Sequence, residues 1–330
     1  MRSARTLGKG RTLLTGLLWT APWWLGFLLF LAVPMGYSLY ISFCDYTLLQ
    51  PPACTGTANY QALAKDETFH KVLYNTFLFT LISVPLTTIL AIFLAVLLNQ
   101  RLRGQAFFRA CIFVPTVVPL VAAGVVWMWI LNPQLGLVNE VVRPIGQALT
   151  PIAAAAEHLP TDIAEPLAGV PTTIREMAAG PAWLDSPRWA MVALVMVSLW
   201  FVGSPMVIYL AGLQEIPEQL YEAARLDGAS AARQVWHVTL PGLSPVILFN
   251  VVINIIGALQ VFALPYVMWR TRQGPEGATY FYTSYLFDNA FRYLKMGYAS
   301  SMAWIQLLLI LALTGLVFWA SRRMVHYEKL

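Results

Sequence analysis

A polar, charged stretch at 212–242 stands between two long apolar segments of the chain. Pro217 precedes Glu218, which predicts the start of a helix with an acid in its first turn, where the helix dipole favours negative charge. Gly228 is expected to end this helix, because glycine adopts the left-handed C′ conformation without a Cβ clash. A short charged helix of this kind suits contact with another molecule better than it suits catalysis.

The same stretch carries more acid than base. Its charged residues are Glu215, Glu218, Glu222, Asp227, Arg225 and Arg233. Helical spacing places Glu218, Glu222 and Arg225 on one face. A second short helix is expected over 231–238, ended by Pro241. By spacing alone, the acidic face could dock in a basic groove of a soluble partner, or it could simply face water.

The sequence contains no recognisable catalytic set. It has no H-E-x-x-H, no nucleophile elbow and no Cys/His cluster with metal spacing, and its four histidines are scattered. It also has no G-x4-G-K-[ST] loop, the usual cradle for the phosphates of ATP. We therefore expect a chain that is not an enzyme and that holds no catalytic residue, cofactor or metal. If ATP drives it, another polypeptide hydrolyses the nucleotide.

The elements that must position the charged stretch are membrane helices. Hydrophobic residues make up 58% of the chain and charged residues only 11%, whereas a soluble domain is nearer 25% charged. Apolar runs of about twenty residues span the bilayer core as helices. We predict an all-α polytopic membrane protein of one domain, 1–330, in which Pro22 and Pro34 divide the first run into an interfacial turn and a kinked span. The six expected transmembrane helices are 23–43, 72–98, 110–131, 189–213, 243–269 and 296–320.

The distribution of Lys and Arg predicts the orientation. Twelve of the 21 lie in 1–11, 100–109, 212–242 and 322–330, and nine lie in the longer segments 44–71, 132–188 and 270–296. The positive-inside rule places the first set in the cytoplasm, so both termini and the stretch 212–242 are expected there. The basic residues form no stripe of the kind that binds nucleic acid, so membrane lipid is expected around the chain and nucleic acid is not.

The stretch 132–188 is the longest loop on the expected outer side, between the third and fourth spans. The prolines expected to cut it into short pieces are Pro144, Pro151, Pro160, Pro166, Pro171, Pro181 and Pro187, with short helices at 152–157 and 172–179. It could be an insertion packed on the outer face or touching an outside partner, or it could be a disordered loop.

The three cysteines are too few for a disulfide framework. Cys44 and Cys54 could pair if both lie in one exported loop, or both could stay as free thiols. Cys111 lies in an apolar run and is expected to be a small core residue.

The stretch 212–242 resembles the E-A-A-x3-G-x9-I-x-L-P loop of ABC importer permeases, with Val238 in place of isoleucine. Further segments resemble the carbohydrate-uptake branch of that family in the expected order. They are Ser42-Phe43-x-Asp45-Tyr46, Asn59-Tyr60, Asn75-Thr76, Pro115-x3-Pro119, Trp127-x-Trp129-x2-Asn132-Pro133-x2-Gly136-x2-Asn139, Gly257-x2-Gln260-Val261-Phe262 and Gly297-Tyr298-Ala299-Ser300. The resemblance covers most of the chain from Trp23 on, and 132–188 fits it least well.

The resemblance implies a type I ABC importer permease fold in a bacterial or archaeal inner membrane. It implies a second permease subunit, two ATPase subunits that hold ATP and magnesium, and an extracytoplasmic solute-binding protein. The implied function is uptake of a sugar or oligosaccharide. Import of glycerol phosphate or another polyol is an alternative within the class. A secondary transporter is an alternative of another class, although the expected spans lack the mid-membrane charges that such carriers use.

The resemblance also assigns the coupling loop 212–242 to contact with the ATPase subunits. The coupling residues expected from it are Glu218, Glu222, Ala223, Ala224, Arg225, Asp227, Gly228, Ala229, Leu240 and Pro241.

A path for the solute is sought among polar groups inside the spans. Asn250, Asn254 and Gly257 form one stripe of a helix, which could bind sugar hydroxyls or could hydrogen-bond neighbouring helices. Further candidates on the last span are Tyr298, Ser301 and Trp304, although a Trp near a span end is more often an interfacial anchor.

Overall fold

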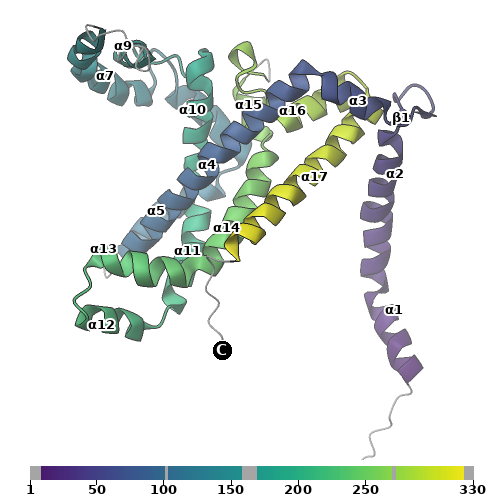
Figure 1. The fold of residues 1–330 in the computed structure, drawn as a ribbon, viewed down its shortest axis with the longest axis horizontal. Helices are drawn as coiled ribbons and strands as arrows, with labels where there is room; N and C mark the ends of the chain where they lie inside the picture. The colour runs from purple at the N-terminus through teal and green to yellow at the C-terminus, as the bar shows by residue number, and fades with distance from the viewer. Residues whose placement is uncertain (1–8, 101–102, 158–168, 270–272, 323–330) are drawn as a thin grey trace, which may run out of the picture. The chain divides into compact units, whose positions relative to one another are not determined.

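The computed structural model consists of helices joined by short connections, with one small two-stranded hairpin (Figure 1). It describes residues 9–100, 103–157, 169–269 and 273–322. Contacts divide the chain into two compact units. Unit 1 comprises Met1–Asp66 and Leu286–Leu308, and unit 2 comprises Glu67–Tyr285 and Leu309–Leu330. Some of the basic residues on which the predicted orientation depends lie outside the described residues. At the two ends of the chain they are Arg2, Arg5, Arg323 and Lys329.

Unit 1 starts with a continuous apolar helix made of α1 (Lys9–Phe27), the π-helical turn η1 (Leu28–Ala32) and α2 (Val33–Ser42). Its stretch Thr15–Ser42 is long and apolar enough to cross a membrane. The expected turn at Pro22 is wrong, because α1 runs through this residue and a membrane helix tolerates the loss of one backbone hydrogen bond. Pro34 lies in the first turn of α2, directly after the wider π turn, where its missing N–H costs little.

The rest of unit 1 gathers around a small hairpin, in which β1 (Cys44–Asp45) pairs antiparallel with β2 (Ala53–Cys54). The side-chain amide of Asn59, on α3 (Ala58–Lys65), donates to the carbonyls of Ser42 and Cys44, both at 2.9 Å. Gly297 approaches the same strand closely, since a Cβ there would lie 2.1 Å from the Cys44 carbonyl oxygen. The motifs around Ser42, Asn59 and Gly297 are far apart in sequence and meet at this hairpin.

The spans of the chain are four long apolar helices and two bent helix pairs, so the described residues hold up to six membrane spans if each pair counts as one. Besides α1–α2, the long ones are α4 (Glu67–Asn99), the run from α13 (Ala231–Gln234) through α14 (Leu240–Leu259) to α15 (Ala263–Met268), and α17 (Met296–Ser321). The bent pairs are α5 (Gln105–Val117) with α6 (Leu120–Ile130), and α10 (Pro187–Leu199) with α11 (Gly203–Glu215). The remaining short helices are η3 (Pro275–Gly277), α16 (Tyr282–Phe287) and η4 (Asp288–Arg292). The prediction of an all-α polytopic membrane protein is confirmed.

The expected spans 110–131 and 189–213 are each divided into two helices by a bend. The first bends by 103° between α5 and α6, because Pro119 forces Val118 into an extended conformation, with ψ 129°. The second bends by 47° before Gly203. A Cβ at Gly203 would lie 2.3 Å from the Ile112 carbonyl oxygen, so the start of α11 packs directly on the backbone of α5.

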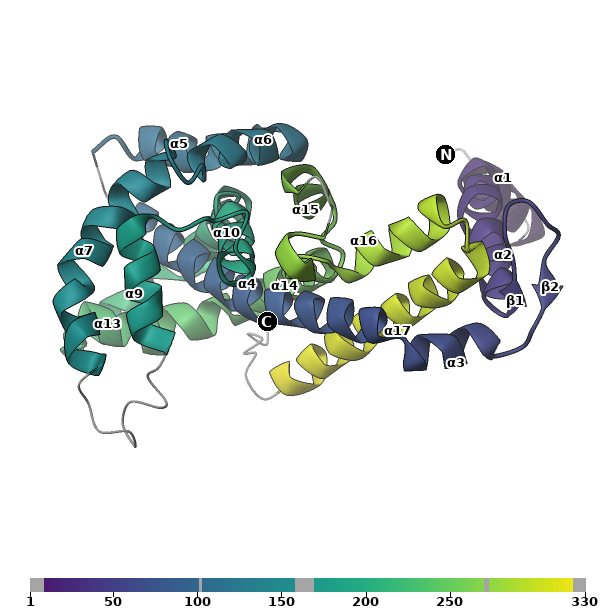
Figure 2. The same cartoon turned by 90° about the horizontal axis from the view of Figure 1, so that it is seen from above.

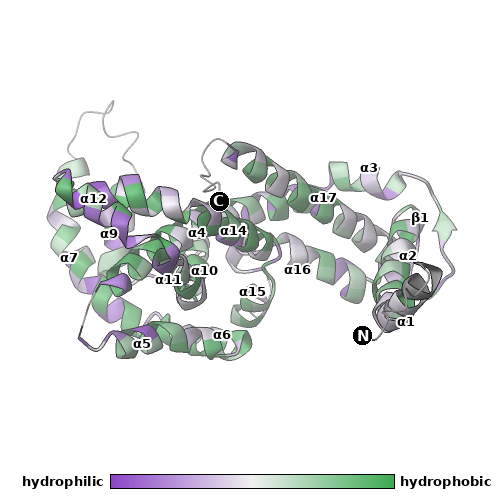
Figure 3. Ribbon diagram, turned by 90° about the horizontal axis from the view of Figure 1, so that it is seen from below, coloured by the Kyte–Doolittle hydropathy of each residue, from purple (hydrophilic) through white to green (hydrophobic). Residues whose placement is uncertain are grey.

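Two apolar cores hold unit 2 together. One contains Trp127 of α6, Trp189 and Leu194 of α10, and Met268 of α15. The other joins α4, α11 and α14 through small residues on α4, Ala91 and Ala95, which let the helices approach closely, against Tyr209 and Leu243. Figure 3 shows the hydrophobic character of these helices and the hydrophilic residues of α12 (Glu218–Leu226).

The insertion 132–188 is a helical hairpin of α7 (Leu137–Glu157) and α9 (Gly169–Ala179), which lie side by side in Figures 1 and 2. The residues of the helices expected at 152–157 and 172–179 are helical, within α7 and α9, whereas the breaks expected at Pro144 and Pro151 are wrong, because α7 continues through both. The Thr150 hydroxyl donates to the Gln147 carbonyl at 2.7 Å, the acceptor that Pro151 leaves without an N–H. Pro160 and Pro166 lie outside the described residues.

Candidate functional site

The candidate coupling residues lie mainly on one short helix, α12 (Glu218–Leu226), whose N-cap is Pro217 and whose first turn contains Glu218. Gly228 has φ +73°, which confirms the predicted left-handed end. Two bonds close this end: the Gly228 N–H donates to the Arg225 carbonyl at 3.0 Å, and the Ala229 N–H donates to the Ala224 carbonyl at 2.8 Å. This is a Schellman motif, and it satisfies carbonyls that the helix end would otherwise leave free.

The surface of α12 is open. Glu218, Glu222, Ala223, Arg225 and Asp227 are all exposed, while Ala224 and Ala229 are half-buried. Leu226 exposes 90% of its area and Leu220 exposes 45%. The charged helix α12 therefore also presents apolar area at Leu226 and Leu220.

A few contacts fix α12 to the following helix. The hydroxyls of Tyr221 and Thr239 are 3.1 Å apart. Ser230 caps α13 (Ala231–Gln234) by accepting from the Arg233 N–H at 3.5 Å. The Gln234 amide donates to the Ala229 carbonyl at 3.0 Å. The turn between the two helices is therefore held by hydrogen bonds at both its ends.

Pro241 does not end the second helix, so that expectation is wrong. The π-helical turn η2 (Val235–Thr239) leads from α13 straight into α14, where the Leu240 N–H donates to the Val235 carbonyl five residues back. The wider turn relieves the proline ring of its clash with the preceding turn, and Pro241 then lies in the first turn of α14. Both residues are half-buried.

Hollows lie on two sides of α12. One, of about 490 Å³, is lined by Pro217, Leu220, His237 and Pro241. The other, of about 670 Å³, is lined by Glu218, Tyr221 and Arg225, together with Asn99 and Gln100 at the end of α4. The helix thus projects from the spans with space around it.

The candidate residues of the solute path on α14 have different surroundings. Asn250 is only 4% exposed and its amide donates to the Val246 carbonyl of its own helix at 3.1 Å. Asn254 is half-buried, and its side-chain nitrogen is enclosed without a hydrogen-bond partner among the described residues. Gly257 is exposed, and a Cβ there would have no neighbour within 4 Å. The stripe therefore runs from the packed position of Asn250 to the open position of Gly257.

The three candidates on α17 belong to unit 1, not to unit 2. The Tyr298 hydroxyl donates to an Asp66 carboxylate oxygen at 2.5 Å. Ser301 is fully buried and donates to the Tyr298 carbonyl at 2.7 Å. Trp304 is half-buried. Tyr298 and Ser301 are thus engaged in contacts within their own unit.

Sequence reasoning did not find the role of α4 in holding a loop of unit 2. The Lys71 ammonium donates to the Glu276 carbonyl, and the Asn75 amide donates to the carbonyls of Gly277 and Tyr280 at 2.9 and 3.0 Å. Thr76 accepts from the Tyr282 N–H at 3.0 Å. Glu276 adopts an unusual positive φ of 51°. The pair Asn75-Thr76 was visible as a motif, but its partners lie about two hundred residues away in sequence.

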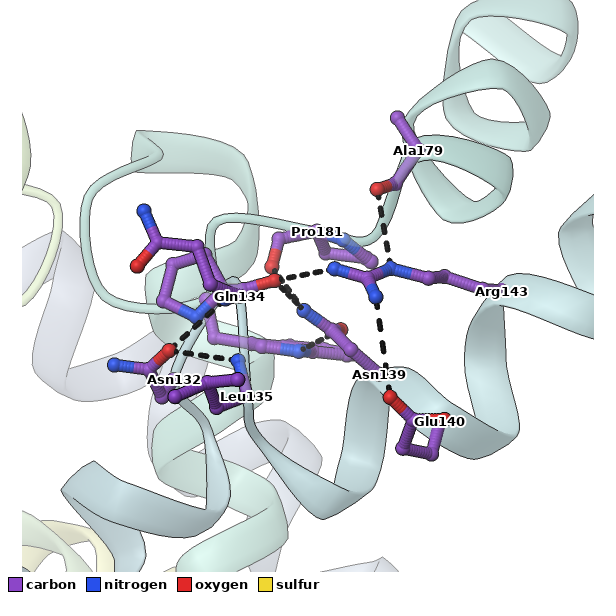
Figure 4. Close-up of polar contacts among 10 residues, drawn as sticks. Asn132, Gln134, Leu135, Asn139, Glu140, Arg143, Ala179 and Pro181 are labelled. Atoms are coloured by element: carbon purple, nitrogen blue, oxygen red, sulfur yellow. Dashed lines mark hydrogen bonds and ion pairs between the residues drawn. The ribbon is translucent and has the colours of Figure 1, made fainter.

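Asn139 is a second buried polar centre (Figure 4). Its amide nitrogen donates to the carbonyls of Pro133 and Pro181 at 2.9 and 3.3 Å, and its oxygen accepts from the Trp183 indole N–H at 2.7 Å. Arg143 reinforces the site by donating to the carbonyls of Pro133 and Ala179. This network fastens the hairpin α7–α9 to the end of α6.

Comparisons with known proteins place the chain in a family. The model of the family described as "Binding-protein-dependent transport system inner membrane component" matches residues 62–326. The chain is 33% identical over 330 residues to the probable ABC transporter permease protein YesP of Bacillus subtilis, covering 99% of this chain and 96% of that protein. It is 32% identical over 317 residues to the sulfoquinovosyl glycerol transport system permease protein SmoG of Agrobacterium fabrum, covering 95% of this chain and 92% of that protein.

The fold is also found among solved structures. A bacterial ABC transporter involved in the import of the acidic polysaccharide alginate has a chain with a TM-score of 0.74 and 21% identity, covering 96% of this chain and 98% of that one. With several apolar helices of spanning length, the protein is a multi-pass membrane protein with the type I ABC importer permease fold. The chain belongs to the family of inner membrane components of binding-protein-dependent transport systems.

Proposed function

We propose that the chain is the permease subunit of an ATP-driven importer, which receives a sugar or oligosaccharide from a solute-binding protein and passes it across the membrane. The family match, over residues 62–326, is the observation that carries this proposal. A chain of this kind is a transport component and hydrolyses no nucleotide itself. ATP and magnesium would be held by two ATPase subunits, and a second permease subunit would complete the path.

The geometry of α12 supports a mechanical link to the ATPase. The helix is short, charged and open, and its Schellman end at Gly228 is fixed by two backbone hydrogen bonds. A rigid helix transmits a displacement better than a loose loop does. Closure of the ATPase dimer would move α12, and the direct continuation of α13 through η2 into α14 would carry that movement into the membrane.

The substrate class follows from the relatives. SmoG is named for sulfoquinovosyl glycerol, and the similar solved structure is an importer of alginate. Glycerol phosphate is not favoured: a phosphate would need a cationic partner, and 243–269 and 296–320 contain no Lys or Arg. A secondary transporter is not favoured either, because the family works with a binding protein.

The coupling proposal is tested by Gly228→Val in the assembled transporter. A β-branched residue strongly disfavours positive φ, so we expect ATP hydrolysis to become uncoupled from uptake. Hydrolysis by purified complexes and uptake of labelled sugar by cells would be measured at matched expression. Gly315→Val is the matched control, since Gly315 lies in α17 with no neighbour within 4 Å and no positive φ.

Two results would overturn the proposal. Purification of the tagged chain should bring along a P-loop ATPase and a second permease, and their absence would contradict the assembly. Wild-type uptake and hydrolysis by Gly228→Val would contradict the role of the α12 turn while leaving the family assignment intact.

A further inference from the structure

Two thiols face each other in the hairpin of unit 1. Cys44 and Cys54 stand directly opposite one another across β1 and β2, and their sulfur atoms are 2.9 Å apart. Cys44 is fully buried and Cys54 is exposed. The third cysteine, Cys111, lies on α5 in unit 2.

The position of the pair in the hairpin suits a covalent bond. The neighbouring pair is hydrogen-bonded, since the Thr55 N–H donates to the Phe43 carbonyl at 3.0 Å, so Cys44 and Cys54 occupy the non-hydrogen-bonded position. At such positions the Cα atoms are about 4.5 Å apart and the side chains are at their closest. Disulfides form at Cα separations of roughly 4.4–6.8 Å. A bond therefore requires side-chain rotation without a change of backbone.

The two thiols differ in reactivity. The hydrogen bond with Cys44 and then the one with Tyr40 lower the pKa of the Cys54 thiol, while the hydrogen bond with Cys54 and burial raise the pKa of the Cys44 thiol. The thiolate is the nucleophile in disulfide exchange. Cys54 is thus both the more accessible group and the more readily ionised one.

We propose that Cys44 and Cys54 form an intramolecular disulfide when segment 44–54 reaches an oxidising compartment. The Cys54 thiolate attacks a sulfur of an oxidant disulfide, a thiol–disulfide oxidoreductase or oxidised glutathione, and releases one of its thiols. The Cys44 thiolate then attacks the Cys54 sulfur of the mixed disulfide and releases the second thiol. The protein loses two protons and two electrons, and the oxidant disulfide becomes a dithiol.

The bond would fix the end of the first span. The Cys44 carbonyl accepts from the Asn59 amide at 2.9 Å and lies against Gly297 at the start of α17. The Gly297 N–H donates to the Tyr46 carbonyl at 3.1 Å. A disulfide here would link β1 to β2 covalently at the point where the hairpin contacts α3 and α17. It also makes the side of the membrane that segment 44–54 faces a measurable property, because disulfides persist only in oxidising compartments.

The test counts free thiols in the full chain. Cells expressing it are quenched in acid, dissolved in SDS with a maleimide–polyethylene glycol reagent, and run on a gel with and without prior reduction. Since the chain has three cysteines, we expect one adduct without reduction and three after it. The Cys111→Ser variant should give no adduct without reduction and two adducts after it. The Cys54→Ser variant should give two adducts in both conditions.

Several outcomes would overturn the proposal. Three adducts on the unreduced wild type would show free thiols. Two adducts on unreduced Cys111→Ser would show that the wild-type bond involves Cys111. A covalent dimer on the non-reducing gel would show pairing between chains. The wild-type count needs no substitution, so it stands even if a variant is poorly expressed, and it is independent of the transported solute.

Discussion

The helix α12 and the hairpin α7–α9 use similar residues in opposite ways. On α12, Leu226 is 90% exposed and the charged side chains face outward. In the hairpin, Asn139 is fully buried, and Gly146 allows α7 to approach the backbone of α9. The hairpin hydrogen-bonds its buried amide and packs its two helices against each other, although Leu137, Val141 and Ile152 remain exposed on its surface. The α12 helix has no buried residue, which is the arrangement expected of a surface that another subunit completes.

The two glycines of these regions express the same difference. A Cβ at Gly146 would lie 2.3 Å from the Ala178 nitrogen, so this glycine is required for space. A Cβ at Gly228 would have no neighbour within 4 Å, and this glycine is required for its positive φ. Gly146 is needed for the close packing of α7 on α9, and Gly228 is needed for the left-handed turn that ends α12.

The largest effect is expected for Asn139→Ala. The change leaves the Trp183 indole N–H and the Pro181 carbonyl without their buried partner, while Arg143 still donates to the Pro133 carbonyl, and the loss costs on the order of 3 kcal/mol. Thermal unfolding in detergent and proteolysis of the insertion would measure this loss. Gln134→Ala, at an exposed neighbouring position, is the control. An unchanged unfolding midpoint for Asn139→Ala would mean that the hairpin is not held by this network.

The next largest loss of stability is expected for Gly146→Ala, and it should exceed the loss for Gly228→Ala. Gly146→Ala should destabilise the protein by about 2–3 kcal/mol, because the added methyl group forces α7 and α9 apart. Gly228→Ala should cost only about 1 kcal/mol, the penalty for a left-handed L-residue in open space. Chemical unfolding of both variants under one set of conditions tests the order. If Gly228→Ala were the more damaging to stability, the distinction between space and φ would be wrong.

A smaller effect, confined to binding, is expected for Leu226→Asp. Stability should change by no more than about 0.5 kcal/mol, because the side chain is exposed. Binding of the ATPase subunit should weaken by about tenfold, or about 1.4 kcal/mol. Leu135→Asp is the matched control in the insertion, since Leu135 is 86% exposed. Co-purification yields would be compared, and equal loss of the ATPase in both variants would remove the difference between the two regions.

The smallest effect is expected for Arg188→Gln beside the hairpin. Arg188 and Glu176 are 3.9 Å apart, with 45% and 44% of their side chains exposed, and exposed ion pairs contribute about 0–1 kcal/mol. In the variant, the Glu176 carboxylate would still accept the hydrogen bond from the Trp189 indole N–H, which is 2.6 Å long. The unfolding midpoint should therefore change little, and should become insensitive to salt. A loss as large as that of Asn139→Ala would show that surface charge, and not the buried amide, holds the hairpin.

The sequence predicted the features that depend on local chemistry. The acid in the first turn of α12, the left-handed Gly228 and the apolar spans all follow from residues that are neighbours in the chain. Proline was the main source of error. Pro22, Pro151 and Pro241 were expected to interrupt helices, and in each case the helix continues. A nearby hydroxyl or a π turn supplies the compensation at Pro151 and Pro241, and no periodicity reveals it.

Contacts between distant segments could not be predicted at all. Asn139 was visible only as part of a motif, because its partners Pro181 and Trp183 come more than forty residues later. The coupling and solute-path assignments remain predictions, since their roles depend on partner subunits. For the path, the structure adds that Asn250 is buried against its own unit and Gly257 is open.

The grip of α4 on the loop 276–282 has a consequence for how this protein can change over generations. The hydrogen bonds from Lys71 and Asn75, and the one that Thr76 accepts, all go to main-chain atoms of that loop. Backbone carbonyls and amides are the same whatever side chain is attached, so these contacts do not restrict the side chain at the exposed position 276, whereas the buried side chains of 279–282 are restricted by packing. A new preference at the loop surface can therefore evolve by ordinary point mutation, without a compensating change in the helix that holds it.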